Sequence, residues 1–151
     1  MPIRAAAGAF ILNSGLTKWK AEEETAKHLH GFASGAYPFL ESAPPEQFAK
    51  ALAATEISLG AALLMPAVVG DSLAGLGLSA FAGGLLGLYM KTPGMRRDGS
   101  VRPSQDGVAF AKDVWLAGIG LTLLSSSLTT RRINRLEHKA KKRKKELKAT
   151  D

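Results

Sequence analysis

Four apolar stretches, at residues 3–19, 48–69, 72–90 and 107–128, constrain this chain more than any other feature. Between residues 57 and 90 the only charged residue is Asp71. Helices in a soluble bundle carry polar residues along the face that meets water, and these stretches leave no room for such a face. The pattern therefore favours four membrane-spanning helices over the alternative, the core helices of a soluble four-helix bundle.

Small residues within the third stretch favour the same interpretation. Gly75, Ser79, Gly83 and Gly87 recur every four residues and would form one ridge on a helix. Such ridges let transmembrane helices approach closely, whereas each glycine would cost a helix in water about 1 kcal/mol. We expect the ridge to pack against another helix, either within the bundle or in a second copy of the chain.

Positive charge is concentrated at the C-terminal end. Residues 131–151 hold ten of the twenty Lys and Arg residues and three acids, so this segment carries +7 and residues 1–130 sum to zero. The sequence thus divides into a four-helix domain, residues 1–130, and a basic tail, residues 131–151. Four crossings put both termini on one side, and the positive-inside rule makes that side cytoplasmic in a plasma membrane, although the loop before residue 107 is also basic.

The segment between the first two stretches, residues 20–47, is too long to be a structureless loop. Acidic residues at its start can begin a helix, and it contains several apolar residues that suit a membrane surface: Leu29, Phe32, Tyr37, Phe39 and Leu40. We expect a short interfacial helix that caps the outer mouth of the bundle. The predicted fold is therefore all-α, an integral membrane four-helix bundle with an interfacial first loop and a basic cytoplasmic C-terminal helix or tail.

Ionisable residues interrupt three of the four stretches: Lys18, Glu56 and the neighbours Lys112 and Asp113. A charge inside a bilayer costs about 3 kcal/mol or more unless it is paired or hydrated. The predicted topology places all four in the outer half of the membrane, where Lys and carboxylate side chains could pair. They form the candidate binding cluster, with Asn13 as a further polar member. The alternative is that Lys18 and Lys112 reach the interface and that the cluster only holds helices together.

Several kinds of chemistry have no support in the sequence. The chain has no cysteine, which excludes disulfides, thiol catalysis, iron–sulfur clusters and Cys-ligated zinc. His28 and His30 are spaced so that they do not share a helical face, and no third ligand accompanies them, so no metal site is predicted. No cofactor is evident, although the charged cluster is compatible with a quinone. The basic tail suits anionic lipid better than nucleic acid, because aromatic residues are not interleaved with its charges.

The chain resembles the DoxX-like family of small four-helix membrane proteins, of the actinobacterial type. The resemblance rests on Gly15 and Lys18 at the end of the first stretch, on Glu56 followed by Gly60, and on Lys112-Asp113 at the start of the fourth. Segments 31–40 and 85–97 also resemble loops of that family, and the whole likeness spans residues 3–128. It implies a four-helix membrane bundle and an association with quinone-linked or thiol-related redox complexes. No catalytic role for these residues follows from it.

Three functions are compatible with these features. The leading hypothesis is a non-catalytic scaffold or accessory subunit of a membrane-associated redox or respiratory complex, which predicts protein partners and no enzymatic activity. The second is an oxidoreductase subunit that binds a quinone or a small sulfur anion at the charged cluster. The third is a small-solute or proton transporter, although no inverted repeat is evident.

Overall fold

The structure is a computed structural model that describes residues 2–148, with side chains described as far as residue 142. Within this range the chain is helical and contains no β-strand, apart from one isolated bridge between Arg96 and Pro103. In chain order the elements are α1 (Pro2–Trp19), α2 (Glu23–Ala36), the 3₁₀ turn η1 (Pro38–Leu40), α3 (Pro45–Leu64), α4 (Asp71–Lys91), α5 (Val108–Ala111) and α6 (Val114–Lys148). The predicted all-α class is confirmed.

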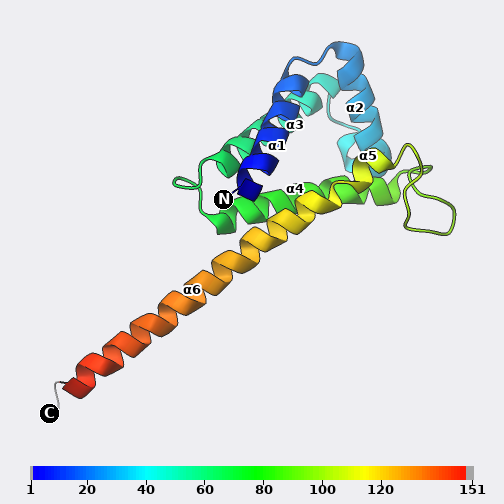
Figure 1. The fold of residues 1–151 in the computed structure, drawn as a ribbon. Coiled ribbons are helices and arrows are strands. Elements are labelled where there is room, and N and C mark those ends of the chain that lie inside the picture. The colour runs from blue at the N-terminus through cyan, green and yellow to red at the C-terminus, as the bar shows by residue number, and fades with distance from the viewer. Residues whose placement is uncertain (1, 149–151) are drawn as a thin grey trace.

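The long helices form two antiparallel pairs, α1 with α3 and α4 with α6 (Figure 1). Glycines bring α1 and α3 into close contact: a methyl group on Gly60 would lie 2.6 Å from the backbone nitrogen of Leu12. One on Gly15 would lie 2.8 Å from the backbone nitrogen of Ile57. The α1–α3 seam therefore depends on the absence of side chains at these positions.

Of the predicted ridge, only the first half packs against α6. A methyl group on Gly75 would lie 2.8 Å from the Gly120 carbonyl oxygen, and one on Gly120 would lie 2.5 Å from Ser79 Oγ. Gly83 faces open space, and Gly87 lies against the hydroxyl group of Tyr37 instead. The four-residue spacing thus serves two different contacts, because α2 and the segment after it cover the second half of α4.

A core of small and branched side chains joins the two helix pairs. Its buried members come from α1, α3, α4 and α6: Ala7, Ile11, Leu63, Ala74, Leu78, Ala82, Leu116 and Leu123. A second cluster joins α2 to α4, with Phe48 of α3 and Phe110 of α5 packed against it. The second cluster holds α2 over one side of the bundle.

The second predicted helix, residues 48–69, has shifted boundaries. In the structure α3 begins at Pro45 and ends at Leu64. Pro45 stands at the first helical position, where a missing N–H is tolerated. Pro66 disfavours a helical conformation at Met65, so the helix stops there and residues 65–69 form a turn.

The structure differs from the fourth predicted helix, residues 107–128, in two respects. The chain tightens at Lys112-Asp113, where hydrogen bonds from Asp113 N to Phe110 O and from Trp115 N to Lys112 O span three residues instead of four. This turn separates α5 from α6. In addition, α6 passes residues 128 and 130 without a break, because Lys, Arg, Glu and Ala beyond them are good helix formers. The predicted basic helix or tail is therefore helical as far as residue 148, and residues 149–151 lie outside the described part.

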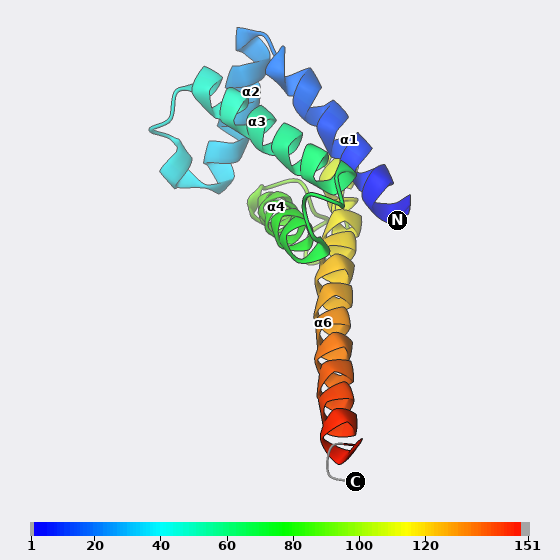
Figure 2. The same ribbon diagram turned by 90° about the vertical axis from the view of Figure 1, so that its left-hand side faces the viewer.

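The predicted helix in the first loop is present as α2, followed by η1. In Figure 1, α2 descends beside α3 toward the far end of α4. Figure 2 views α4 nearly along its axis and shows α6 extending well beyond the rest of the molecule. Residues 128–142 of that extension are exposed.

Two helical segments of the described chain, Asp71–Lys91 and Val108–Lys142, are long and apolar enough to cross a membrane. Helix α1 matches its predicted range and α3 overlaps the range predicted for it, but both helices are less apolar than these two segments. One carries Arg4 and Lys18, and the other carries three charged residues, Glu46, Lys50 and Glu56.

Candidate functional site

Lys18 and Glu56 form an ion pair across the α1–α3 seam. Lys18 Nζ lies 3.0 Å from Glu56 Oε1 and 2.9 Å from Oε2, and it also donates to Ser14 Oγ at 2.6 Å. Glu56 is buried, whereas the Lys18 side chain is 23% exposed. Gly15 lets the backbones approach on this side of the helices, so that one ammonium group reaches both carboxylate oxygens. Each charge of this pair is neutralised by the other.

Lys112 and Asp113 lie at the turn between α5 and α6. Asp113 is buried, and its carboxylate interacts electrostatically with Lys112, Glu56 and Lys18. Lys112 is exposed, and its ammonium nitrogen lies 5.4 Å from the centre of the Phe10 ring. The turn gives these neighbours different surroundings, because Lys112 lies against α1 while Asp113 turns inward. The structure thus brings together the four charged residues that the sequence singles out.

All four charged residues line one cavity of about 470 Å³, which lies between the two helix pairs. This volume falls within the range of sites for small molecules, about 300–1,000 Å³. The rest of the lining is mainly apolar. It includes five of the six phenylalanines of the chain, together with Tyr37: Phe10, Phe32, Phe48, Phe81 and Phe110. The cavity could hold a molecule with an apolar, ring-containing body and a polar head beside the charges.

The segment that the sequence predicts as a cap closes one side of this cavity. Leu29, Phe32, Tyr37 and Leu40 belong to the lining, whereas Phe39 is 76% exposed. Tyr37 donates a hydrogen bond to the Gly84 carbonyl at 2.9 Å, and the Phe32 ring stacks on Phe110 with centres 5.0 Å apart. These contacts tie the cap to α4 and α5.

Asn13, the fifth member of the predicted cluster, lies outside the cavity, as does His30, for which no site was predicted. Asn13 is exposed, does not line the cavity, and contributes only its backbone carbonyl to a hydrogen bond from Thr17. His30 lies within hydrogen-bonding distance of the Leu40 carbonyl, 2.9 Å, and against the edge of Phe48. Across the described residues no group of three or more His, Cys, Asp or Glu side chains could hold a metal ion.

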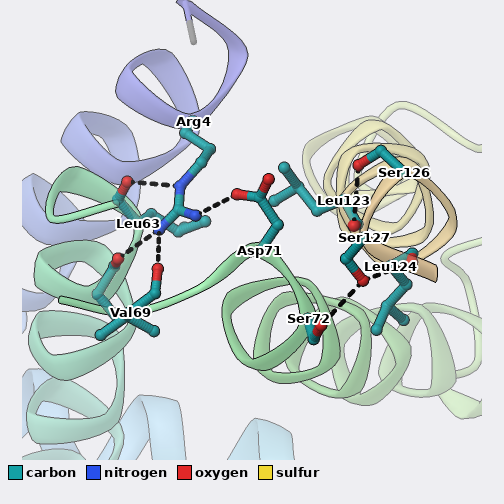
Figure 3. Close-up of polar contacts among 10 residues, drawn as sticks. Arg4, Leu63, Val69, Asp71, Ser72, Leu123, Leu124, Ser126 and Ser127 are labelled. Carbon is teal, nitrogen blue, oxygen red and sulfur yellow. Dashed lines mark hydrogen bonds and ion pairs between the residues drawn. The ribbon is translucent and has the colours of Figure 1, made fainter. Parts of the chain in front are cut away.

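A second buried ion pair, formed by Arg4 and Asp71, was not predicted from the sequence. Arg4 is 1% exposed, forms an ion pair with Asp71 at the start of α4, and donates to the carbonyls of Leu63 at 3.0 Å, Ala62 at 2.7 Å and Val69 at 3.0 Å. Figure 3 shows the guanidinium group reaching from α1 to the end of α3 and to Asp71. The signal that could have found it is a single arginine among apolar residues.

At the same end of the molecule a side-chain hydrogen bond connects α4 to α6, also drawn in Figure 3. Ser72 donates to Ser127 Oγ at 2.9 Å, and Ser127 donates in turn to the Leu124 carbonyl at 2.8 Å. Arg4, Asp71 and the two serines therefore join all four long helices at the end away from the cavity.

The chain matches no protein-family model, no curated protein and no solved structure.

Proposed function

We propose that the protein is an integral membrane subunit of the DoxX-like type that binds a quinone-class molecule and serves as an accessory component of a membrane redox complex. The observation that carries this proposal is the aromatic cavity with Lys18, Glu56, Lys112 and Asp113 in its wall. Charged residues in membrane-spanning segments are costly and often mark functional sites, and here they line an aromatic cavity of a size that suits a small molecule.

In the proposed topology α1, α3, α4 and α5–α6 cross the plasma membrane, and both termini are cytoplasmic. Large apolar side chains on the outer surface of α4 and α6 support this arrangement: Leu73, Leu76, Trp115 and Leu121 are each more than half exposed. Water would not favour these positions, whereas lipid would. The test is labelling of single-cysteine variants in intact cells, for which the cysteine-free chain is a clean background. A cysteine in place of Ser100 should react with a membrane-impermeant maleimide, and one in place of Thr130 should not.

Binding is tested by titrating the purified protein in mild detergent with decylubiquinone, a soluble quinone, and measuring the heat released. Saturable binding is expected, weakened about tenfold by Lys112→Met, which removes a charged hydrogen-bond donor. Lys20→Met is the matched control, because Lys20 is exposed and does not line the cavity. Absence of saturable binding in the unmodified protein would contradict the proposal.

The non-catalytic scaffold remains a second candidate, and one observation favours it. Helix α6 extends beyond the bundle, and five of its basic residues follow one another on one side at helical spacing: Arg131, Arg132, Arg135, Lys139 and Lys142. Such a surface suits anionic lipid headgroups at the cytoplasmic leaflet or an acidic protein partner. A protein that purifies from membranes alone under mild conditions would argue against a scaffold.

A further inference from the structure

The four charges of the cavity differ in how completely they are satisfied. Lys18 and Glu56 contact one another directly, with Ser14 as a third partner. Asp113 is 7% exposed, and among the described side chains none donates a hydrogen bond to its carboxylate. Lys112 has no carboxylate within 4.0 Å in the same part of the chain, and its close neighbour is the Phe10 ring. The cavity therefore contains one acceptor and one donor, adjacent in sequence, that remain available to a ligand.

The Asp113 carboxylate lines the cavity and has no donor among the described side chains, so a ligand that donates a hydrogen bond there would satisfy it. Because both groups line the same cavity, one ligand group can satisfy both only if it donates and accepts at the same time. A hydroxyl group does this, since its O–H donates and its oxygen lone pairs accept. A carbonyl group only accepts, so it would satisfy Lys112 and leave Asp113 without a partner.

The walls indicate what carries that hydroxyl. Five of the six phenylalanines line the cavity, Phe10 lies beside Lys112, and the rings of Phe32 and Phe110 are stacked on each other. Aromatic side chains bind rings in offset or edge arrangements that add to simple apolar burial. A flexible acyl chain would not use this geometry.

We propose that the cavity binds a phenolic ligand, whose hydroxyl group donates to the Asp113 carboxylate and accepts from the Lys112 ammonium group. This inference rests on the proposed function, because it concerns the same cavity. For a quinone couple it means that the reduced form, the quinol, is the better ligand. In this arrangement Asp113 selects ligands that can donate a hydrogen bond, and Lys112 binds any ligand oxygen that can accept one.

The test compares 4-heptylphenol with 4-heptylanisole, in which a methyl group replaces the hydroxyl hydrogen, by calorimetric titration in the same detergent. Loss of a charge-assisted hydrogen bond should weaken binding of the ether by about tenfold or more. In Asp113→Leu the two compounds should bind equally. Asp98→Leu is the control, since Asp98 is exposed in the loop before α5 and does not line the cavity. Cooperative thermal unfolding would verify that each variant is folded.

The results of these titrations distinguish failure of the phenolic inference from failure of the quinone-class proposal. Equal binding of phenol and ether to the unmodified protein would overturn this inference and leave the quinone-class proposal standing, since decylubiquinone would still bind. No saturable binding of phenol, ether or decylubiquinone would overturn both. If decan-1-ol binds as tightly as the phenol, the phenolic class is wrong and the hydroxyl belongs to a lipid alcohol. Because the first comparison uses the unmodified chain, it holds even if a variant misfolds.

Discussion

The two buried ion pairs of the molecule, Arg4–Asp71 and Lys18–Glu56, lie near opposite ends of α1 and differ in what surrounds them. Arg4 is completely enclosed by the ends of α3 and α4, with three carbonyl oxygens and one carboxylate as acceptors. Lys18 is partly exposed and shares a cavity with two further charges. The same kind of contact therefore occurs in two different settings, one enclosed by the protein and one beside a cavity.

The difference shows how to separate a structural charge from one available to a ligand. At Arg4 the protein supplies acceptors for the guanidinium group, so nothing remains for another molecule. Beside Lys18 and Glu56, the neighbouring Asp113 lacks a donor among the described side chains. The two ends differ in burial, and they also differ in how many of their charged groups have hydrogen-bond partners within the protein.

The largest effect is expected from Arg4→Met. Removing the guanidinium group leaves a partly buried carboxylate and three carbonyl oxygens without their donor, a loss of about 3–5 kcal/mol in the free energy of unfolding. Denaturation of the purified protein in mixed micelles would measure it. Arg97→Met is the control, because Arg97 is exposed in the loop between α4 and α5. Equal stability of the two variants would mean that the Arg4 pair does not hold the helices together.

A smaller effect is expected from a substitution at Gly60, where α1 and α3 are in close contact between the two ion pairs. Gly60→Ala would place a methyl group 2.6 Å from the Leu12 backbone nitrogen, so the helices must separate at a cost of about 1–3 kcal/mol. Separation would also disturb the Lys18–Glu56 pair and weaken ligand binding. Gly118→Ala is the matched control: its methyl group meets nothing within 4 Å, and alanine should stabilise α6 by up to about 1 kcal/mol. The same sign of change in both variants would contradict the close seam.

Glu56→Gln should cost less, about 1 kcal/mol, because Lys18 keeps Ser14 and can be hydrated at its exposed side. Glutamine also still accepts a hydrogen bond. Glu46→Gln, at the exposed start of α3, is the control. If Glu56→Gln were as damaging as Arg4→Met, the proposed distinction between the two pairs would be wrong.

The smallest effect is expected for the exposed pair of Glu23 and Lys27 on α2, with oxygen and nitrogen 2.6 Å apart. The hydrogen bond and charge of Lys27 lower the pKa of Glu23 below 4.5, and those of Glu23 raise the pKa of Lys27 above 10.5. The contribution of the Glu23–Lys27 pair to stability is therefore fully present at pH values between 4.5 and 10.5. It is lost as the pH falls through the lowered pKa of Glu23 or rises through the raised pKa of Lys27. Because water screens both groups, Glu23→Gln at pH 7 should leave the thermal unfolding midpoint unchanged. A clear shift would show that α2 depends on this contact.

Much of the secondary structure was predictable because its causes are local. Apolar runs, prolines and turn residues predict the helices, and α1 and α4 match their predicted ranges within one residue at each end. The apolar run continues to residue 69, five residues beyond the end of α3, because the turn after Leu64 is as apolar as the helix itself. The turn at Lys112-Asp113 had no signal in the sequence, since neither residue is a helix breaker.

The candidate site was predictable in its residue types but not in its contacts. Charges in apolar sequence were expected to meet, because an isolated charge is costly in a nonpolar environment. Which charges pair depends on antiparallel packing of α1 on α3, and that packing depends on shape at Gly15 and Gly60. The enclosure of Arg4 could not be foreseen for the same reason, because its acceptors are backbone carbonyls far away in the chain.

The sequence by itself determined that this chain is helical, that it segregates apolar and basic residues, and that a few charges need partners. Those properties follow from composition and spacing, which act over one or two helical turns. Only the tertiary structure decided that Arg4 is satisfied, that Lys18 and Glu56 pair, and that Asp113 is left facing an aromatic cavity. The physical reason is that hydrogen-bond satisfaction depends on three-dimensional proximity, which packing between distant helices creates.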